Sequence, residues 1–316
     1  MCYSYVKLSR NDFGILRLPI SGLGLGNLLF PWARFMIATK EYRLRPIFPT
    51  WFQIRFGPIL RGEKDKRFYH DLFCKPQGQI GGWRKLYLLS RLGRITEDEF
   101  LSNPQRFSFR KAIIVFEGER DYFRPLQGWD QFLYKEIRSM TDQRWLRRVD
   151  EMPDIPIGIH VRRGDFCDPK SMEDFKNKGA LKTPLTWFIE SLNLIRNVVN
   201  SSVQAFVVSD GTDGELRELL ALKNIVRMTT GSAIGDLLAL STAKIFLSSG
   251  GSSFSAWASF LGQMPTISHP GQPLAWFNLI NRKGYYIGEF NPSSPSPFFI
   301  NSVRDSLQKK IKRHPI

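Results

Sequence analysis

Short apolar runs alternate with stretches of helical periodicity over residues 155–269, and this alternation restricts the fold more than any other feature of the sequence. Strands and helices that alternate in this way build a parallel sheet, because parallel neighbours need a crossover connection. The expected strands cover 155–161, 205–210, 224–230, 244–249 and 265–269. One helix is expected to begin with Thr183 as N-cap and Pro184 in its first turn, and others cover 213–222, 232–242 and 253–261. The second half of the chain is therefore expected to be a Rossmann-like α/β domain.

The first 150 residues are less regular, and a domain boundary is expected at the linker 150–156. The glycine-rich segment SGLGLGN (21–27) precedes an expected apolar helix over 28–42, and a strand is expected over 111–118. The segment differs from GxGxxG, since its third glycine is one position early. Three interpretations stay open: a dinucleotide turn, a plain loop, or a turn where a sugar nucleotide or an acceptor approaches backbone N–H groups.

Charge and composition restrict the class of partner. The chain has 45 Lys and Arg against 29 Asp and Glu, a net charge of +16, which favours nucleic acid, anionic lipid headgroups or phosphorylated substrates. Three cysteines without a CxxC pair, and four histidines without an HExxH pair, argue against a protein metal site and fit a reducing compartment. The start lacks the pattern of a signal peptide, and no long uncharged apolar stretch follows, so a cytoplasmic protein is expected.

The segment HVRRGDF (160–166) places two arginines directly after an expected strand. Ligands of open α/β sheets bind at the carboxyl ends of the strands, and guanidinium groups match phosphate oxygens. Strand alternation aims only one of Arg162 and Arg163 into the crevice, so the other is expected to hold the loop or an acid such as Asp165. The alternative is a pair of surface arginines in a turn.

Two further segments follow strands in the same way. In SSGGSSFSAW (248–257), Ser252, Ser253 and Ser255 either donate to a phosphate or cap the following helix. In FVVSDG (206–211), Asp210 either contacts a ribose or base, or belongs to an ordinary Asp-Gly turn.

Together these segments resemble the fucosyltransferases of glycosyltransferase family 11. The first family motif is matched by Gly24-Leu25-Gly26-Asn27-Leu28-Leu29-Phe30, with Leu28 where the family has glutamine. The second is matched at 160–166, with Phe166 in place of tyrosine. The third is matched by Asp236-Leu237-Leu238, Leu240-Ser241, Lys244 and residues 252–257, with an extra residue at Gly250-Gly251.

The resemblance implies a GT-B-like chain with two Rossmann-like domains: an acceptor-binding domain over 1–150 and a GDP-sugar-binding domain over 151–316. It implies inverting, metal-independent transfer of L-fucose from GDP-L-fucose to a galactoside hydroxyl, with an α-1,2 linkage. Arg162 would bind the donor β-phosphate, and Asp165 is a candidate general base beside it. The other expected donor contacts are His160, Arg163, Asp210, Ser252, Ser253, Phe254 and Ser255, and the expected acceptor loop contains Gly24, Gly26 and Asn27.

The expected acceptor is a galactose-containing oligosaccharide or a lipid-linked glycan, and the basic first half suits peripheral contact with an anionic membrane. Two alternatives remain from the residues alone. One is a transferase of the same architecture that uses another nucleotide sugar, since no residue pattern specifies the sugar. The other is a non-enzymatic nucleic-acid-binding protein, which the charge and the aromatic residues between 51 and 94 allow. The resemblance implies no specific nucleic-acid partner.

Overall fold

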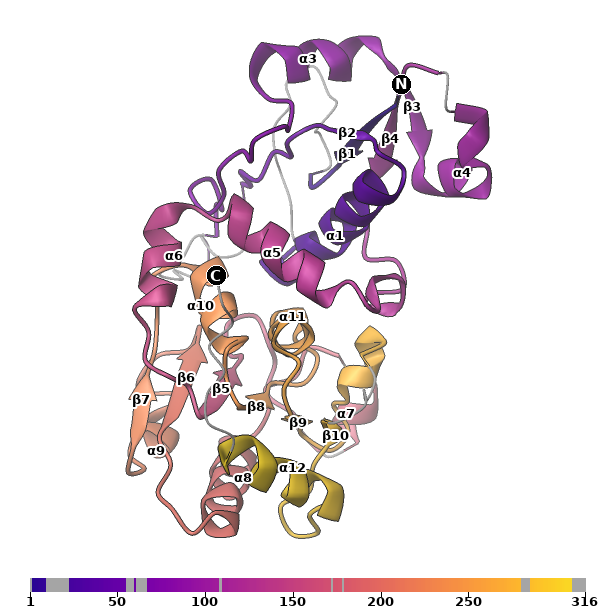
Figure 1. Cartoon of the computed structure of the whole chain (residues 1–316). Helices are drawn as coiled ribbons and strands as arrows, with labels where there is room; N and C mark the ends of the chain where they lie inside the picture. The colour runs from indigo at the N-terminus through magenta and orange to yellow at the C-terminus, as the bar shows by residue number, and fades with distance from the viewer. Residues whose placement is uncertain are drawn as a thin grey trace. The chain divides into compact units, whose positions relative to one another are not determined.

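The computed structural model describes residues 2–9, 23–54, 60, 67–107, 110–171, 173–177, 179–279 and 285–308. It contains two compact units, Met1–Leu146 and Arg147–Ile316. Figure 1 shows that each unit has its own sheet with helices around it. The two units are described separately below. Part of one sequence expectation, the start of the glycine-rich segment at 21–22, lies outside the described residues.

The first unit is built on a four-stranded sheet in the order β2-β1-β4-β3. The strands are β1 (Tyr3–Val6), β2 (Arg45–Pro46), β3 (Gly93–Thr96) and β4 (Ala112–Phe116), and the pairings between them are parallel. Its helices are α1 (Leu25–Glu41), α3 (Gly82–Arg91), α4 (Glu97–Ser102), α5 (Asp130–Met140) and α6 (Gln143–Asp150), the last of which continues into the second unit. Short 3-10 turns cover Pro104–Phe107 and Arg124–Leu126. The expected strand at 111–118 is confirmed.

Helix α1 is buried along most of its length, which agrees with its almost uninterrupted apolar sequence. It begins at Leu25 and not at residue 28, so the expected extent of the glycine-rich turn is wrong. Gly24 is the N-cap with an ordinary φ of −69°, and Gly26 and Asn27 lie in the first helical turn. The expectation failed because the one glycine inside the helix, Gly26, costs only about 1 kcal/mol of helix propensity, which burial of the apolar face outweighs.

The second unit is built on a six-stranded sheet in the order β10-β9-β8-β5-β6-β7. The strands are β5 (Ile157–Val161), β6 (Ala205–Ser209), β7 (Ile225–Arg227), β8 (Ile245–Ser248), β9 (Thr266–Ser268) and β10 (Ile287–Glu289). Neighbouring strands pair in parallel, as the alternating sequence predicted. The chain runs outward from β5 through β6 to β7 and then returns to β8 on the other side of β5. The strand order therefore reverses between β5 and β8.

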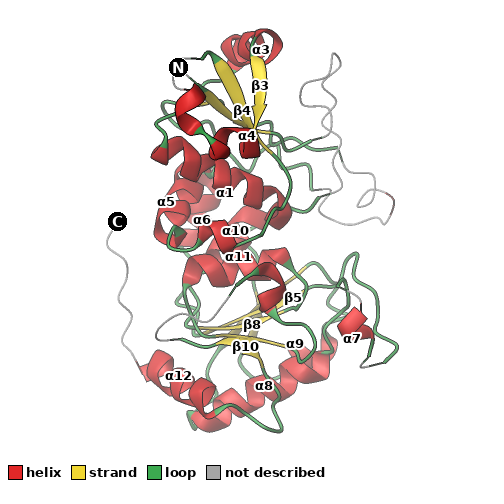
Figure 2. Ribbon diagram, turned by 90° about the vertical axis from the view of Figure 1, so that its right-hand side faces the viewer, coloured by secondary structure: helices red, strands yellow, loops and turns green. Residues whose placement is uncertain are grey.

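Helices cover both faces of this sheet. Figure 2 shows α10 (Ala233–Leu240) and α11 (Ser253–Gly262) on one face, and α8 (Leu185–Val198) and α12 (Pro297–Gln308) on the other. The remaining helical elements are α7 (Asp174–Asn177), α9 (Arg217–Leu220) and the 3-10 turn Leu274–Phe277. The expected α/β class with two Rossmann-like units is confirmed.

Strand β5 divides its side chains between two cores. Ile157, Ile159 and Val161 pack with apolar residues of α8 and α12. Gly158 and His160 face the opposite layer, where a Cβ at Gly158 would lie 3.0 Å from the Cβ of Ala243, just after α10. Side chains alternate across a strand, so this pattern directs Arg162 toward the α10–α11 face and Arg163 toward α8.

Two local expectations in this unit are wrong. Thr183 does not cap α8: Pro184 occupies the N-cap position, and the Thr183 hydroxyl donates to Oε1 of Gln272 at 2.9 Å. The expected helix over 213–222 is reduced to Arg217–Leu220, preceded by turns. The turns agree with Gly214 in this segment and Gly211 just before it, because glycine weakens a helix that has little apolar surface to bury.

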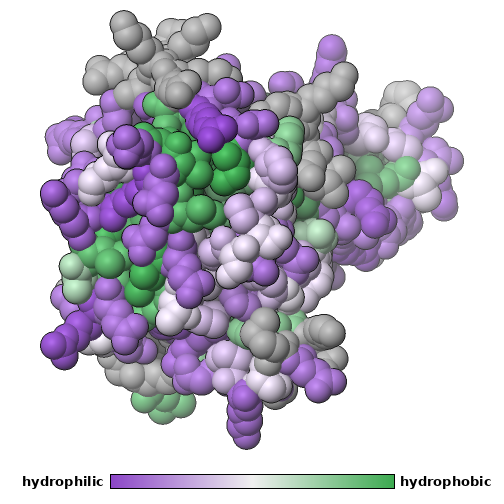
Figure 3. Space-filling model, turned by 90° about the horizontal axis from the view of Figure 1, so that it is seen from below, coloured by the Kyte–Doolittle hydropathy of each residue, from purple (hydrophilic) through white to green (hydrophobic). Residues whose placement is uncertain are grey.

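The end of the molecule formed by α8 and α12 faces the viewer in Figure 3. Green apolar side chains gather there in patches between purple hydrophilic ones. Apolar residues of these helices that are only partly buried include Ile189, Leu194, Ile300 and Leu307. Part of this face is therefore apolar.

Candidate functional site

The polar residues singled out from the sequence meet at the carboxyl edge of the second sheet, where the strand order reverses between β5 and β8. Crevices at such reversal points are where open α/β sheets bind ligands. Ser249, which follows β8, joins the two strand ends: its hydroxyl accepts from the backbone N–H of Arg162 at 2.8 Å and donates to the carbonyl of His160 at 3.0 Å. Ser249 was not among the expected site residues, although a serine directly after a strand is the signal that could have identified it.

Arg162 extends from this junction with about a fifth of its side chain exposed. Its guanidinium forms ion pairs with Asp165 through Nη2 and with Asp210 through Nη1, the latter at 2.6 Å. The ring of Phe166 lies 5.5 Å from the guanidinium carbon. Arg162 is therefore held from three directions with its fork near the surface, which preorganises a permanent positive charge.

Asp210 fixes the backbone as well as this side chain. Its Oδ1 accepts from the backbone N–H of Arg163 at 2.8 Å, while Oδ2 pairs with Arg162. One guanidinium and two carboxylates give the cluster of Arg162, Asp165 and Asp210 a formal charge of −1. An incoming phosphate must therefore compete with a carboxylate for the guanidinium.

Arg163 points the other way, as strand alternation predicted. Its side chain is 7% exposed and Nη1 donates to the carbonyl of Thr183 at 3.0 Å. Burial is the main reason that the pKa of Arg163 is lowered, with nearby carboxylates acting in the opposite direction. A Cβ on Gly211 would lie 2.7 Å from Cγ of Arg163, so the arginine stem packs directly on this glycine. Arg163 thus holds the loop that leads into α8.

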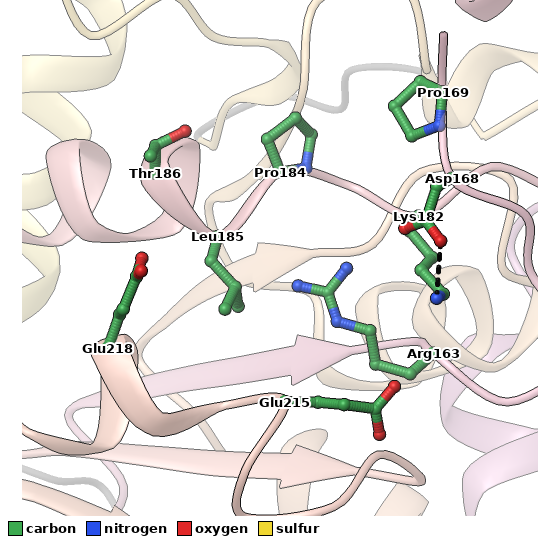
Figure 4. A pocket seen from close by; sticks show the side chains of 9 residues that line it. All are labelled: Arg163, Asp168, Pro169, Lys182, Pro184, Leu185, Thr186, Glu215 and Glu218. Atoms are coloured by element: carbon green, nitrogen blue, oxygen red, sulfur yellow. Dashed lines mark hydrogen bonds and ion pairs between the residues drawn. The ribbon is translucent and has the colours of Figure 1, made fainter.

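A pocket of about 450 Å³ opens on this side of the sheet. Figure 4 shows the Arg163 guanidinium between Leu185 and Lys182, with Glu215 nearby and Lys182 paired to Asp168. That pair measures 3.0 Å. The lining carries more negative than positive side chains, because Glu218 adds to Asp168 and Glu215. The pocket is therefore a poor match for the diphosphate expected near Arg163.

His160 and Ser255 lie beneath the site. Both are buried, and Nδ1 of His160 lies 2.7 Å from the Ser255 hydroxyl, with the imidazole 4.8 Å from the ring of Phe254. Burial, and secondarily the positive charge of Arg162, lower the pKa of His160 to about 3 against an opposing effect of Asp210. The imidazole is therefore neutral at physiological pH. It anchors α11 to β5.

The start of α11 is open to an anion. Ser252 is the N-cap residue and its hydroxyl accepts from the backbone N–H of Ser255 at 3.4 Å. Ser253 and Phe254 follow it in the first turn, where backbone N–H groups have no intrahelical acceptor. Both are only partly buried. This end of a ten-residue helix can receive a phosphate oxygen.

The two glycines before α11 allow the close packing of this loop. Gly251 has a φ of +68°, and a Cβ there would lie 2.0 Å from the carbonyl oxygen of Gly179. A Cβ on Gly250 would lie 2.0 Å from the Cβ of Gln272. The residue inserted relative to the family motif therefore lies where a side chain cannot fit.

The expected acceptor residues Gly24, Gly26 and Asn27 belong to the first unit. There the backbone N–H of Leu25 donates to the Tyr69 hydroxyl at 3.0 Å, and Asn27 forms a hydrogen bond with Glu119. In the described ranges, no group of three or more His, Cys, Asp or Glu residues could hold a metal ion. None of the helices in those ranges is both long and apolar enough to cross a bilayer.

Each of the two units is a parallel α/β unit, and a guanidinium lies at the reversal point of the second sheet. Residues 129–281 match the model of Glycosyl transferase family 11, so the chain carries that family's sequence over this segment and the predicted resemblance is confirmed.

Several solved structures are similar at low identity. Fucosyltransferase NodZ from Bradyrhizobium aligns with a TM-score of 0.48 and 12% identity, over 86% of this chain and 97% of that one. Arabidopsis thaliana FUT1 in complex with GDP aligns with a TM-score of 0.46 and 14% identity, over 84% of this chain and 70% of that one. The E. coli heptosyltransferase WaaC with ADP aligns with a TM-score of 0.40 and 13% identity, over 96% of each chain. No curated protein matches the sequence.

Proposed function

We propose that the protein transfers L-fucose from GDP-L-fucose to a hydroxyl of a galactose-containing glycan, with inversion at the anomeric carbon and an α-1,2 linkage. Support for the donor comes from the family 11 segment, which includes the arginine pair and the serine-rich turn. Support for the α-1,2 linkage and the galactoside acceptor comes from the sequence resemblance to the family's α-1,2-fucosyltransferases.

The single observation that carries the proposal is the position of Arg162. The Arg162 guanidinium lies at the reversal point of the sheet, with about a fifth of the side chain exposed, and is held by Asp165 and Asp210. Ser253 and Phe254 begin α11, which follows the neighbouring strand β8. Their backbone N–H groups lie at the N-terminus of this helix. A diphosphate is the ligand that uses both a planar cation and a helix N-terminus.

In the proposed reaction the bond between the anomeric carbon of fucose and the β-phosphate oxygen breaks, and its electron pair goes to GDP. Negative charge therefore grows on the leaving phosphate. Arg162 stabilises that charge more strongly than it stabilises the bound donor, which lowers the barrier. Asp210 acts as a positioning residue for Arg162, and Asp165 competes with the diphosphate for the same guanidinium. No step requires a metal ion.

Arg163, His160 and Ser255 have supporting roles in this proposal. Their side chains are buried and bonded within the protein, so each fixes a strand or helix end and does not touch the donor. Ser252 supports the site as the cap of α11. The expected donor contacts are thereby narrowed to Arg162, Ser253 and Phe254.

Calorimetric titration of GDP and GDP-fucose, in the presence of EDTA, tests the proposal. Saturable binding is expected in the wild type and no measurable binding in Arg162→Ala. Arg217→Ala, which removes an exposed arginine of α9 outside the site, is the matched control and is expected to bind normally. Equal binding by Arg162→Ala and wild type would contradict the assignment of the diphosphate to Arg162. Tighter binding of another nucleotide sugar than of GDP-fucose would change the proposed donor sugar and leave the assignment of the diphosphate to Arg162 unchanged.

A further inference from the structure

Helix α3 (Gly82–Arg91) is attached to the first unit by one side only. Leu88 and Leu89 are buried in a core cluster with apolar residues of β1 and β4. Lys85 lies on the same side, and its ammonium group donates to the Thr50 hydroxyl at 2.8 Å. The spacing of these helix positions, three and four residues apart, places them along one stripe of the helix. The rest of the helix circumference is therefore turned away from the core.

The opposite side of α3 is aromatic and apolar. Trp83 is 87% exposed, Tyr87 is 63% exposed and Leu86 is 37% exposed. Leu86 follows Trp83 by three residues and Tyr87 follows it by four, so the three side chains form one patch. A surface helix normally carries polar and charged residues on its outward side, because apolar area in contact with water is unfavourable. An exposed apolar patch on such a helix is typical of an interaction site.

Basic residues border this patch. Arg84 and Arg91 lie three residues before and four residues after Tyr87, which places them along one edge of the patch, and both are exposed. Neither guanidinium is paired with a carboxylate in the part of the chain that the structure describes. The surrounding segment 72–96 has no Asp or Glu and five basic residues, which are Lys75, Arg84, Lys85, Arg91 and Arg94. The patch therefore lies in a region of positive charge.

We propose that α3 binds the surface of a membrane that contains anionic lipids. Trp83, Leu86 and Tyr87 enter the region between headgroups and acyl chains, where Trp and Tyr rings are favoured because they are apolar with one polar group. Arg84 and Arg91 contact the phosphate and carboxylate groups of the lipids. Helix α3 has ten residues, so it lies along the surface and does not cross the bilayer. The inference goes beyond the proposed transfer reaction and does not depend on it.

The charge and the composition of the patch favour a membrane over other partners. Two copies of the chain, each with a net charge of +16, would repel each other when their arginine-bordered patches meet. Single-stranded nucleic acid also binds basic and aromatic residues, but its bases stack on rings and make no use of Leu86. A lipid surface uses the aromatic, apolar and basic residues together, since it offers negative charge above an apolar layer.

Co-sedimentation of the full chain with lipid vesicles tests the inference. The wild type is expected to bind vesicles of phosphatidylcholine and phosphatidylserine at low salt, and to bind vesicles of phosphatidylcholine alone much more weakly. Trp83→Ala with Tyr87→Ala should weaken binding to the mixed vesicles by about tenfold or more, because less apolar area leaves water. Arg84→Gln with Arg91→Gln should weaken it by about fivefold for each arginine.

Variants in the second unit are the matched controls. Trp276→Ala removes a tryptophan that is 40% exposed, and Arg217→Gln with Lys223→Gln removes as much positive charge as the arginine variant of α3. These controls are expected to bind the mixed vesicles as the wild type does. The replaced side chains are exposed, so the melting temperature should be the same in every variant. Equal weakening in the controls and in the α3 variants would overturn the inference, because the net charge alone would then explain the binding.

Fluorescence locates the contact on the chain. Nitroxide-labelled lipid in the mixed vesicles is expected to quench the tryptophan emission of Trp83→Phe less than that of the wild type, because this variant keeps an apolar ring but lacks the indole that enters the lipid. Equal quenching of the two proteins would overturn the inference. So would a wild type that does not bind the mixed vesicles, or that binds phosphatidylcholine alone equally well.

Two further outcomes would assign the patch to another partner and overturn the inference. One is a dimer, seen in sedimentation equilibrium, that Trp83→Ala dissociates. The other is tight binding of a single-stranded oligonucleotide that is lost in Trp83→Ala with Tyr87→Ala, while binding to the mixed vesicles is unchanged in that variant.

Discussion

Oδ2 of Asp210 lies 2.6 Å from Nη1 of Arg162. Asp210 directly follows β6 and Arg162 directly follows β5, so the ion pair joins the ends of two neighbouring strands. The same carboxylate accepts from the backbone N–H of Arg163 at 2.8 Å. Asp210 therefore controls both the direction of the guanidinium and the path of the chain that carries it. Asp165 touches the same guanidinium from within its own turn.

This difference predicts opposite effects of removing the two carboxylates. Asp165→Asn removes a negative charge beside the diphosphate position, so GDP is expected to bind about tenfold more tightly. Asp210→Asn loses the charge that positions Arg162 and weakens the bond to the Arg163 backbone, so GDP is expected to bind about tenfold less tightly. Calorimetry on both variants checks the prediction. Equal effects would mean that the carboxylates act only through their charge.

Gly251→Ala is expected to destabilise the second unit by about 2 kcal/mol or more, because the position combines a positive φ with no room for a Cβ. Gly214→Ala is the matched control, since its nearest neighbour to a new Cβ is Thr212 Oγ1 at 3.8 Å. Urea unfolding followed by circular dichroism gives both free energies. A stable Gly251→Ala protein would show that the turn before α11 has another conformation.

His160 predicts a loss of stability in acid. Its pKa is lowered to about 3 in the folded protein, so between about 6.5 and 3 the unfolded chain binds the extra proton. The contribution of His160 to the free energy of unfolding is therefore fully present above about pH 6.5, and it is lost as the pH decreases toward 3. From pH 7 to pH 5 His160 accounts for a loss of about 2 kcal/mol, at about 1.4 kcal/mol for each pH unit.

His160→Gln keeps a polar side chain beside Ser255 but removes the titrating group. Urea titrations at pH 7 and pH 5 give its free energy of unfolding. Between these pH values it should fall by about 2 kcal/mol less than that of the wild type. The pKa of His269 is also lowered by burial, and it contributes to the pH dependence of both proteins alike. If the variant lost as much free energy of unfolding between pH 7 and pH 5 as the wild type does, His160 would not be buried as a neutral imidazole.

The buried pair of Arg34 and Glu97 predicts a large cost for removing one partner. Arg34 donates to the Glu97 carboxylate and to the carbonyls of Glu117 and Gly118 in the loop after β4. Arg34→Met leaves the Glu97 carboxylate buried without its cation and frees this loop, at about 3–5 kcal/mol. Replacing both residues, as in Arg34→Met with Glu97→Leu, should cost less than the single change. Denaturant unfolding of the two variants checks this order. The reverse order would mean that the loop contacts of Arg34, and not its charge, dominate.

The fold class follows from sequence features that repeat over many residues. Alternating apolar runs and helices predicted five of the six strands of the second unit, β5 to β9, which the structure confirms with ends that differ by no more than three residues. Strand β10 was not predicted. Single-residue expectations failed where packing decides: Thr183 bonds to Gln272 and leaves the N-cap to Pro184. The end of the glycine-rich segment became part of α1 for the same reason, because burial of that helix outweighs the low helix propensity of Gly26.

The sequence by itself determined that two arginines follow a buried strand and that only one of them faces the crevice, since alternation along a strand is local. Only the tertiary structure decided which acid each arginine meets. Asp210 is 48 residues beyond Arg162 in the sequence, and Asn27 and Glu119 are 92 residues apart, yet parallel strands bring each pair to one sheet edge. Such pairings depend on strand order, which reverses between β5 and β8. Strand order is set by the packing of the whole core and not by the residues adjacent in the chain.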